Sequence, residues 1–320
     1  MKKWISVAMP FIGLGIFAWI VKGTGVDRIL DIFRHVNPWH LAVFPLFTVF
    51  TIWVRGYRWW VLMRLVGIDY SRWRSSSVWA IGFFAASVTP GKVGDAVRAF
   101  YESRDTVRGF GECFLTVFVD RLLDLVTILV FGLVTVLIFS YKYIDIPSFW
   151  VIIVASVALL GFMYLVLNRT LMRKLMGPVF KFLTPAKYRD RLSAQVDGFY
   201  DSLSLYGRHW GATLFALFLT LLFWAVVLVL AWTITLVLGI GVPFGYIVLI
   251  MPTLTLVELI PVSVSGIGTR DAAAVFFFSV IGIGSAEAMS FALLYLIFGT
   301  YFNALVGFFA WLANPAKLRQ

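Results

Sequence analysis

Long apolar runs alternate with short basic segments along the whole chain. Six of the runs are long enough to cross a bilayer, because a spanning helix needs roughly 20 mostly apolar residues. They are Trp4–Val21, Trp39–Val54, Gly111–Ser140, Phe149–Leu167, Trp210–Leu238 and Glu287–Leu312. The pattern predicts an all-α polytopic membrane protein with six full spans. No polar stretch reaches domain size, so we expect residues 1–320 to form a single transmembrane domain.

Two further apolar segments are interrupted by glycine and proline. Ser77–Val88 stops after about a dozen residues, and Tyr246–Ile260 runs into a Gly-rich stretch that is followed by Ala272–Ile283. Short hydrophobic segments with such interruptions are typical of re-entrant or discontinuous helices. We therefore expect two re-entrant hairpins, at residues 77–98 and 246–283. Their non-helical backbone must line a cavity, because lipid cannot satisfy its N–H and C=O groups.

The basic segments predict the orientation of the chain. Five Arg and one Asp lie between Arg55 and Arg74, and eight Lys or Arg lie between Arg169 and Arg208. Cytoplasmic loops carry the excess of Lys and Arg. Both termini are therefore expected in the cytoplasm, with the first break entering from the cytoplasmic side and the second from the outer side.

Opposite directions at the two breaks suggest an inverted repeat, as in many transporters. The first half would be residues 1–168 and the second half residues 209–320. Between them, residues 169–208 carry apolar positions at helical spacing from Leu192 to Tyr206, which predicts an amphipathic helix on the inner leaflet. The alternative is that the two breaks are unrelated Gly-rich turns.

Composition excludes several classes of protein. Hydrophobic residues make up 61% and charged residues 13% of the chain, whereas soluble domains are about 45–50% apolar and about 25% charged. The net charge of +11 fits basic cytoplasmic loops and anionic headgroups better than nucleic acid. With Cys113 as the single cysteine and three His, we expect no internal disulfide, metal or cofactor. Sequence motifs of serine hydrolases and zinc proteases are absent.

The first break holds the densest polar cluster in an apolar setting. Gly91 and Gly94 allow close backbone approach, and Lys92 and Arg98 supply cationic donors. A helix beginning near Gly94 would aim N–H groups at the same place, so the cluster predicts a phosphate site. The order of residues is not that of a P-loop. The alternative is a cytoplasmic turn whose basic side chains merely face headgroups.

Carboxylates within apolar segments form a second set of candidates. Asp120, Arg121 and Asp124 lie within a long apolar run, and Glu258 precedes the second break. Charges at membrane depth are costly and usually face a bundle interior or a wet cavity. Asp120 and Asp124 could counter Lys92 or Arg98 or couple transport to protons, or they could form only a structural salt bridge. For Glu258 we expect a partner that is distant in the sequence.

All candidate headgroup-binding residues come from these segments, and none is expected to be catalytic. They are Thr89, Gly91, Lys92, Gly94, Asp95, Arg98, Asp120, Arg121, Asp124, Glu258, Ser265, Gly266, Gly268, Arg270 and Asp271.

Three motifs together resemble those of a known family. Residues 90–98 resemble its Pro-Gly-Lys-x-Gly-Glu-x-x-Arg pattern, with Asp95 in place of Glu. Residues 120–124 resemble its Glu-Arg-x-x-Asp pattern, again with Asp for Glu, and residues 265–271 resemble a later Gly-rich motif that ends in Glu, here Asp271. The chain thus resembles the lysylphosphatidylglycerol synthase transmembrane-region, or flippase-like, family in order and spacing over nearly its whole length.

The resemblance implies lipid translocation rather than an enzymatic activity. Bifunctional relatives carry a soluble aminoacyltransferase domain after the membrane region; this chain stops at Gln320, so we expect it to lack aminoacyl-lipid synthesis. Expected substrates and partners are membrane lipids with a polar or anionic headgroup: aminoacyl-phospholipid, polyprenyl-phosphate-linked or hopanoid-type lipids. The expected location is the cytoplasmic membrane of a prokaryote, with a homo-oligomer possible. Alternatives are an integral-membrane enzyme acting on a lipid phosphate, with Asp120, Asp124 or Glu258 as acid–base group, and an accessory membrane subunit.

Overall fold

The computed structural model describes residues 2–142, 186–259 and 265–314, together with Ser263 and positions 157, 161, 164, 165, 167–172 and 174. Within these residues all regular secondary structure is helical. The predicted span Phe149–Leu167 lies largely outside the described residues, as does much of the segment 169–185. The all-helical class predicted from the sequence is confirmed for the described part of the chain.

Thirteen α-helices are bounded in the described residues, together with a 3₁₀-helix, η1, and a π-helix, η2. The elements are α1 (Lys2–Thr24), α2 (Val26–Arg34), α3 (Pro38–Leu41), α4 (Phe44–Leu65), α5 (Arg72–Ser87), η1 (Pro90–Ala96), α6 (Val97–Asp105), α7 (Phe110–Lys142), α10 (Ala186–Arg208), α11 (Trp210–Val237), α12 (Phe244–Leu259), α13 (Thr269–Val280), α14 (Ser285–Leu294), η2 (Tyr295–Tyr301) and α15 (Phe302–Ala313).

Three helical stretches in the described residues are long and apolar enough to cross a membrane. They are Pro38–Leu65, Trp210–Val237 and Ser285–Ala313, and each overlaps a predicted span. α7 is also long, with 33 residues, but it carries the charged residues Asp120, Arg121 and Asp124 in its middle. These helices support a multi-pass membrane protein.

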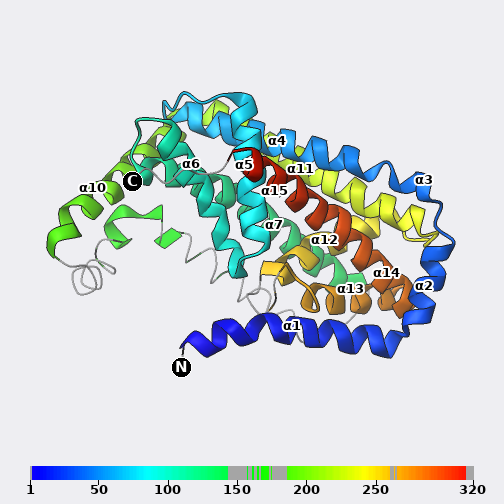
Figure 1. The fold of residues 1–320 in the computed structure, drawn as a ribbon. Helices are drawn as coiled ribbons and strands as arrows, with labels where there is room; N and C mark the ends of the chain where they lie inside the picture. Colours follow the sequence, from blue (N-terminus) through cyan, green and yellow to red (C-terminus); the bar gives the residue numbers. More distant parts are fainter. Residues whose placement is uncertain are drawn as a thin grey trace.

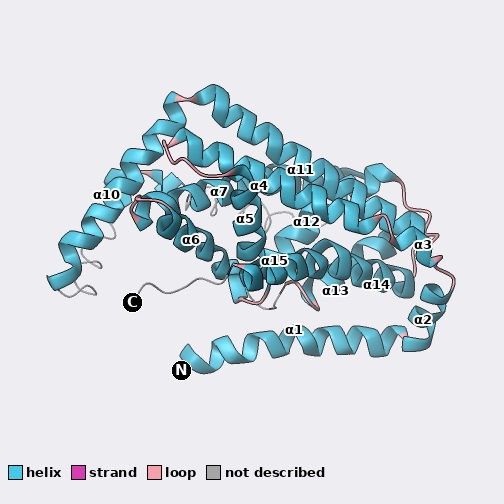
Figure 2. Ribbon diagram, turned by 45° about the horizontal axis from the view of Figure 1, so that its top comes forward, coloured by secondary structure: helices cyan, strands magenta, loops and turns pink. Residues whose placement is uncertain are grey.

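The helices pack into one bundle, with α1 along the lower edge and α10 at the left end of both views (Figure 1, Figure 2). α4 packs along α11, α5 packs between α4 and α15, and α12 packs against α7. α1 contacts α13 and α2. The predicted amphipathic segment is helical from Ala186, and α10 packs on α7.

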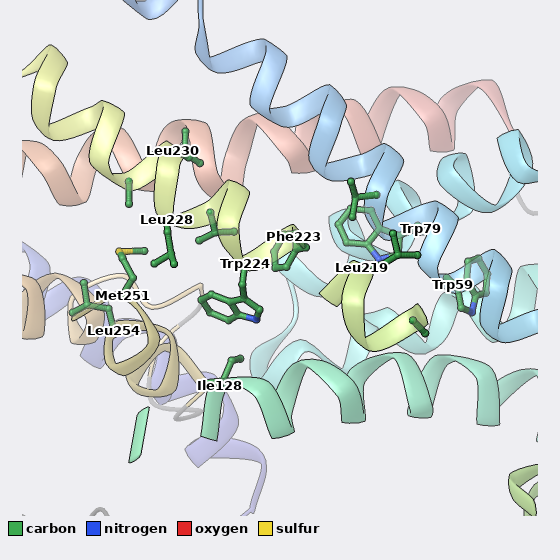
Figure 3. Close-up of a cluster of buried hydrophobic side chains, with 14 of the residues drawn as sticks. Trp59, Trp79, Ile128, Leu219, Phe223, Trp224, Leu228, Leu230, Met251 and Leu254 are labelled. Carbon is green, nitrogen blue, oxygen red and sulfur yellow. The ribbon is translucent and has the colours of Figure 1, made fainter. Parts of the chain in front are cut away.

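Tryptophan, phenylalanine and aliphatic side chains fill the bundle centre between α4, α7, α11 and α12. Trp59 and Trp79 are almost fully buried, and Trp224 of α11 faces Ile128 of α7 (Figure 3). Lipid tails are as apolar as these side chains, so close packing rather than the hydrophobic effect must hold the helices together.

Glycines bring pairs of helices into close contact. A Cβ on Gly307 of α15 would lie 2.0 Å from the carbonyl oxygen of Ala80 in α5, and a Cβ on Gly132 of α7 would lie 2.5 Å from Leu256 in α12. Small residues at such crossings are the usual means of close helix packing in membranes. The two short helices that precede the breaks are each fixed in this way.

Both predicted interruptions are present in the fold. α5 ends at Ser87 and is followed by η1 and then α6, while α12 ends at Leu259 and α13 begins at Thr269. α6 begins at Val97, three residues after the helix start expected near Gly94. Gly268 precedes α13 with a positive φ of 83°, a conformation that favours glycine.

Candidate functional site

Arginines and aspartates, most of them buried, form a connected ionic network where α4, η1, α6 and α7 meet. Its members, called here the Arg–Asp network, are Arg55, Arg58, Asp95, Arg98, Asp120, Arg121 and Asp124. They come from α4, η1, α6 and α7. With four arginines and three aspartates, the network carries a formal charge of +1.

Arg58 joins three helices. It is fully buried in α4, its Nη2 lies 2.6 Å from Asp120 Oδ1, and its Nη1 lies 2.6 Å from Asp124 Oδ1. The same Nη1 donates a hydrogen bond of 2.9 Å to Thr220 of α11. A buried ion is tolerated only when it is paired and hydrogen-bonded, and Arg58 meets both conditions.

Arg98 links the first break to α7. Its Nη1 donates to Asp120 Oδ2 at 2.9 Å and its Nη2 donates to Asp95 Oδ2 at 2.6 Å. Arg121 also donates to Asp95. Gly82 of α5 makes room for this arrangement, because a Cβ there would lie 2.4 Å from Arg98 Cγ.

Thr89 and Gly94 shape the first break rather than facing open space. Thr89 Oγ1 accepts a hydrogen bond of 2.8 Å from the Gly94 amide. A Cβ on Gly94 would lie 2.2 Å from the carbonyl oxygen of Ala85. The close backbone approach expected of Gly94 is therefore an approach to α5.

A second ionic cluster surrounds Glu258 at the end of α12. Lys92 Nζ lies 3.0 Å from Glu258 Oε1, and Arg270 Nη1 lies 3.5 Å from Glu258 Oε2. Arg270 is also 3.4 Å from Asp271, whose Oδ2 accepts a hydrogen bond of 2.9 Å from the Gly268 amide. The expectation that Glu258 has a partner distant in the sequence is confirmed.

The two breaks contact each other reciprocally. Lys92 of the first break pairs with Glu258, at the end of the helix before the second break. Ser265 of the second break donates a hydrogen bond of 2.9 Å to the carbonyl oxygen of Ser87, at the end of the helix before the first. Within the described residues, Lys92 and Ser265 are also the two non-glycine residues with positive φ, 57° and 52°.

Gly266 and Gly268 complete the second break. A Cβ on Gly266 would lie 2.9 Å from Glu258 Cγ, and one on Gly268 would lie 2.1 Å from the carbonyl oxygen of Gly13 in α1. Both have positive φ. Glycine is therefore needed at these positions for conformation and for space.

A cavity of about 480 Å³ lies between the two ionic groups. Its charged lining comes from six residues: Arg55, Lys92, Asp95, Arg121, Asp124 and Glu258. Its walls are otherwise mainly apolar and aromatic. They include Trp79 of α5 and Phe223 and Trp224 of α11 (Figure 3). The guanidinium carbon of Arg55 lies 3.6 Å from the centroid of the Phe223 ring, a cation–π contact at the junction of polar and apolar surfaces.

Five of the fifteen candidate residues line the cavity: Lys92, Asp95, Arg121, Asp124 and Glu258. Arg98, Asp120, Arg270 and Asp271 lie behind them as ion-pair partners. Thr89, Gly94, Ser265, Gly266 and Gly268 shape the two breaks. Gly91 is part of η1.

Sequence reasoning missed Arg55 and Arg58, which it counted with a basic cytoplasmic segment. Both are buried within α4. Their i,i+3 spacing, which places them on one face of a helix, was the available signal. Asn303 of α15 was also missed; it lines the cavity and donates to the Gly299 carbonyl oxygen at 3.1 Å, inside the π-helix.

A separate polar cluster lies outside the candidate spans and is centred on Asp105. Tyr70 Oη donates to Asp105 Oδ2 at 2.8 Å and Arg74 Nε donates to the same oxygen at 2.9 Å, while Arg104 bonds Oδ1. Burial alone would raise the pKa of Asp105, but hydrogen bonds from Tyr70, Arg104 and Arg74 outweigh burial and hold it below its usual value.

No group of three or more His, Cys, Asp or Glu side chains in the described ranges is placed to hold a metal ion. The cavity chemistry there is that of arginine, lysine and carboxylate side chains.

Comparison with known proteins supplies the family. The family described as lysylphosphatidylglycerol synthase TM region matches residues 5–307. A UPF0104 membrane protein of Methanocaldococcus jannaschii is 23% identical, over 93% of this chain and 90% of the relative. A UPF0104 membrane protein of Pyrococcus horikoshii is 20% identical, over 96% of each chain. No solved structure matches the chain. On the family match, which spans nearly all of its length, this chain belongs to the lysylphosphatidylglycerol synthase transmembrane-region family.

Proposed function

We propose that the chain is a flippase- or scramblase-type transporter that moves a lipid with a polar or anionic headgroup across the membrane. The observation that carries the proposal is the cavity between the two helix breaks, which combines ionic side chains with apolar walls. A lipid has the same division between headgroup and acyl chains. The membership of the chain in a membrane family named for a lipid-modifying protein supports a lipid-related role.

The cost of moving a headgroup through hydrocarbon explains why such a cavity is useful. A charge at the bilayer centre costs several kcal/mol or more. In the cavity, Lys92 and Arg121 would replace water around the headgroup, while Phe223, Trp224 and Val227 would contact the acyl chains. Fixed charges that are already paired need little reorganisation when the headgroup arrives.

Reciprocal packing supports an inverted repeat as the basis of movement. α5 packs on α15, the last helix after the second break, and α12 packs on α7, the long helix after the first. The close contacts at glycine lie in the same two helix pairs: Gly307 of α15 contacts Ala80 of α5, and Gly132 of α7 contacts Leu256 of α12. In inverted-repeat transporters, substrate sites lie at the interface of the repeats and rocking of one repeat gives access from alternate sides.

We place both termini in the cytoplasm of a prokaryotic cell as part of this proposal. The basic segments near Arg72 and Arg208 support it through the positive-inside tendency. The first break would then admit headgroups from the inner leaflet and the second from the outer leaflet. The two breaks contact each other beside the cavity.

Headgroup-labelled lipid in proteoliposomes tests the function. Val227 lines the cavity, and Val227→Trp would fill its apolar side without altering a charge. Val229 lies on the same helix but is 41% exposed and outside the lining, so Val229→Trp is the matched control. We expect Val227→Trp to slow lipid movement by about tenfold and Val229→Trp to leave it unchanged. Movement no faster than in protein-free vesicles would contradict the proposal.

A further inference from the structure

The charges that a ligand can reach in the cavity are cationic. The side chains of Lys92 and Arg121 are 31% and 29% exposed, whereas those of Arg55, Asp95, Asp124 and Glu258 are 9%, 5%, 8% and 9% exposed. The lining contains equal numbers of positive and negative side chains, but all three carboxylates are largely buried. An incoming headgroup therefore meets an ammonium and a guanidinium first.

Each of these buried carboxylates forms ion pairs with at least two cationic side chains. Asp95 pairs with Arg98 and Arg121. Asp124 pairs with Arg55 and Arg58. The arginines already form the ion pairs that a ligand amine would make. An incoming ammonium group therefore finds neither of these carboxylates unpaired.

Glu258 has the same double pairing, with Lys92 and Arg270. Its two partners differ in accessibility, because Arg270 is only 2% exposed. Lys92 has three N–H donors, so a phosphate can bind it while Glu258 stays paired with both Lys92 and Arg270. Binding an anion would not leave a buried charge alone, which is the costly outcome in a site of this kind.

Among the residues that line the cavity, the buried polar atoms without a hydrogen-bond partner are also mostly donors. Buried nitrogens without a hydrogen-bond partner in the described chain include Arg55 Nε, Arg121 Nη2 and the indole Nε1 atoms of Trp79 and Trp224. All four residues line the cavity. The corresponding oxygens in the lining are Oδ1 of Asp95 and Oδ1 of Asn303.

Of these two oxygens, Asp95 Oδ1 points toward α5. A Cβ on Gly82 of α5 would be 3.0 Å from Asp95 Oδ1. Asn303 supplies a neutral amide oxygen, and its nitrogen donates to the carbonyl oxygen of Gly299. The lining residues thus leave more donors than negative acceptors without a partner, and their most exposed charges are those of Lys92 and Arg121.

We propose that the cavity selects a lipid whose headgroup carries a phosphate but no amine, such as one with glycerol or sugar hydroxyls beyond the phosphate. This inference rests on the proposed function for its lipid, and on the cavity alone for its headgroup. The phosphate accepts charge-assisted hydrogen bonds from Lys92 and Arg121. An ammonium on the same headgroup faces these two cations and is repelled.

Binding rather than transport provides the test. The purified full chain in detergent is titrated with dihexanoyl phosphatidylglycerol and with dihexanoyl phosphatidylethanolamine, which share chains and phosphate but differ by the amine. The readout is the thermal shift of the protein. We expect the phosphatidylglycerol to bind about tenfold more tightly, the effect of one net charge-assisted contact. Glycerol 3-phosphate is titrated in parallel to separate a lipid from a soluble phosphate ester.

Variants assign the preference to the cavity. Lys92→Met and Arg121→Met should each lower phosphatidylglycerol affinity about tenfold and reduce the preference over phosphatidylethanolamine. Lys22→Met is the matched control, because Lys22 is an exposed lysine in the last turn of α1. It should retain the wild-type preference. If Arg121→Met does not fold, Lys92→Met alone decides, since Glu258 keeps Arg270 in that variant.

The outcomes separate this inference from the proposed function. Equal affinity for the two lipids, or an unchanged preference in Lys92→Met, would overturn the headgroup selectivity even if lipid movement is observed. Glycerol 3-phosphate binding as tightly as the lipid would support the phosphate chemistry but count against a lipid ligand, and so against translocation. Selective lipid binding without movement would uphold the selectivity and contradict only the transport.

Discussion

Ser265 donates a hydrogen bond of 2.9 Å to the carbonyl oxygen of Ser87, so the second helix break is tied to the helix that leads into the first. The Lys92–Glu258 ion pair makes the converse connection. Both connecting side chains belong to residues in the left-handed backbone region. Non-glycine residues are uncommon there and cost free energy, so the surrounding contacts must hold these two turns in place.

Substitutions at Ser265 should separate the hydrogen bond from the backbone conformation. Ser265→Ala removes the bond and keeps the left-handed cost, so we expect unfolding free energy to fall by about 1 kcal/mol. Ser265→Gly removes the same bond but also removes a conformational cost of roughly 1 kcal/mol. Thermal melts in detergent should therefore rank wild type and Ser265→Gly close together, with Ser265→Ala lower. Equal loss in both variants would show that the backbone of Ser265 is not strained.

Arg58 should be essential to the fold, whereas Arg64 of the same helix should not be. Arg58 is fully buried and pairs with Asp120 and Asp124; breaking a buried pair costs about 3–5 kcal/mol. Arg64 pairs with Asp69 in an exposed setting, with side chains 54% and 91% exposed, where a pair is worth at most about 1 kcal/mol. Arg58→Met should therefore lose folded protein on size-exclusion chromatography while Arg64→Met elutes like wild type. Similar behaviour of the two would contradict a stabilising network.

Acid should destabilise the cluster around Asp105. Its folded-state pKa is below the usual value of an aspartate, so the carboxylate contributes stability that is fully present above the unfolded pKa. That stability is lost as the pH falls through the lower, folded pKa. Melting curves between neutral pH and about pH 3, near the ordinary aspartate pKa of about 3.9, should show a smaller acid-induced loss in Asp105→Asn than in wild type. An identical acid dependence would assign the effect to other groups.

The protein should leave lipid phosphates chemically unchanged. In the described chain, Asp120, Asp124 and Glu258 are each paired with cations, which suits them to hold positive charge rather than to exchange protons with a substrate. Phosphatidylglycerol incubated with the purified protein should keep its mass on mass spectrometry. Turnover that disappears in Asp124→Asn would instead establish an enzyme.

The sequence was sufficient for the features that depend on local composition. Glycine and proline within apolar runs marked both breaks, since neither residue continues a helix well. The i,i+4 spacing of Asp120 and Asp124 placed them on one face of α7, where both now meet Arg58. Local pattern and the final structure agree at these positions.

Features that depend on distant partners could not be predicted. Arg55 and Arg58 follow an apolar run, and basic residues there usually mark the membrane surface; only the aspartates of α7 allow α4 to continue with them buried. The partner of Glu258 was likewise invisible, because Lys92 lies in the other half of the chain. Asn303 carried no signal, as its position depends on the π-helix before it.

The distribution of ionic residues along the chain has a consequence for biogenesis. Up to residue 121, the cations Lys92, Arg98 and Arg121 outnumber the aspartates of these ion pairs, Asp95 and Asp120. Around the second break the balance is reversed, with Glu258 and Asp271 against Arg270. The part that leaves the ribosome first therefore enters the bilayer with surplus positive charge, and its counter-ion is synthesised much later. Until α12 is inserted, Lys92 has to find water or an anionic headgroup. Docking of α12 beside η1 then gives Lys92 a carboxylate partner within the protein.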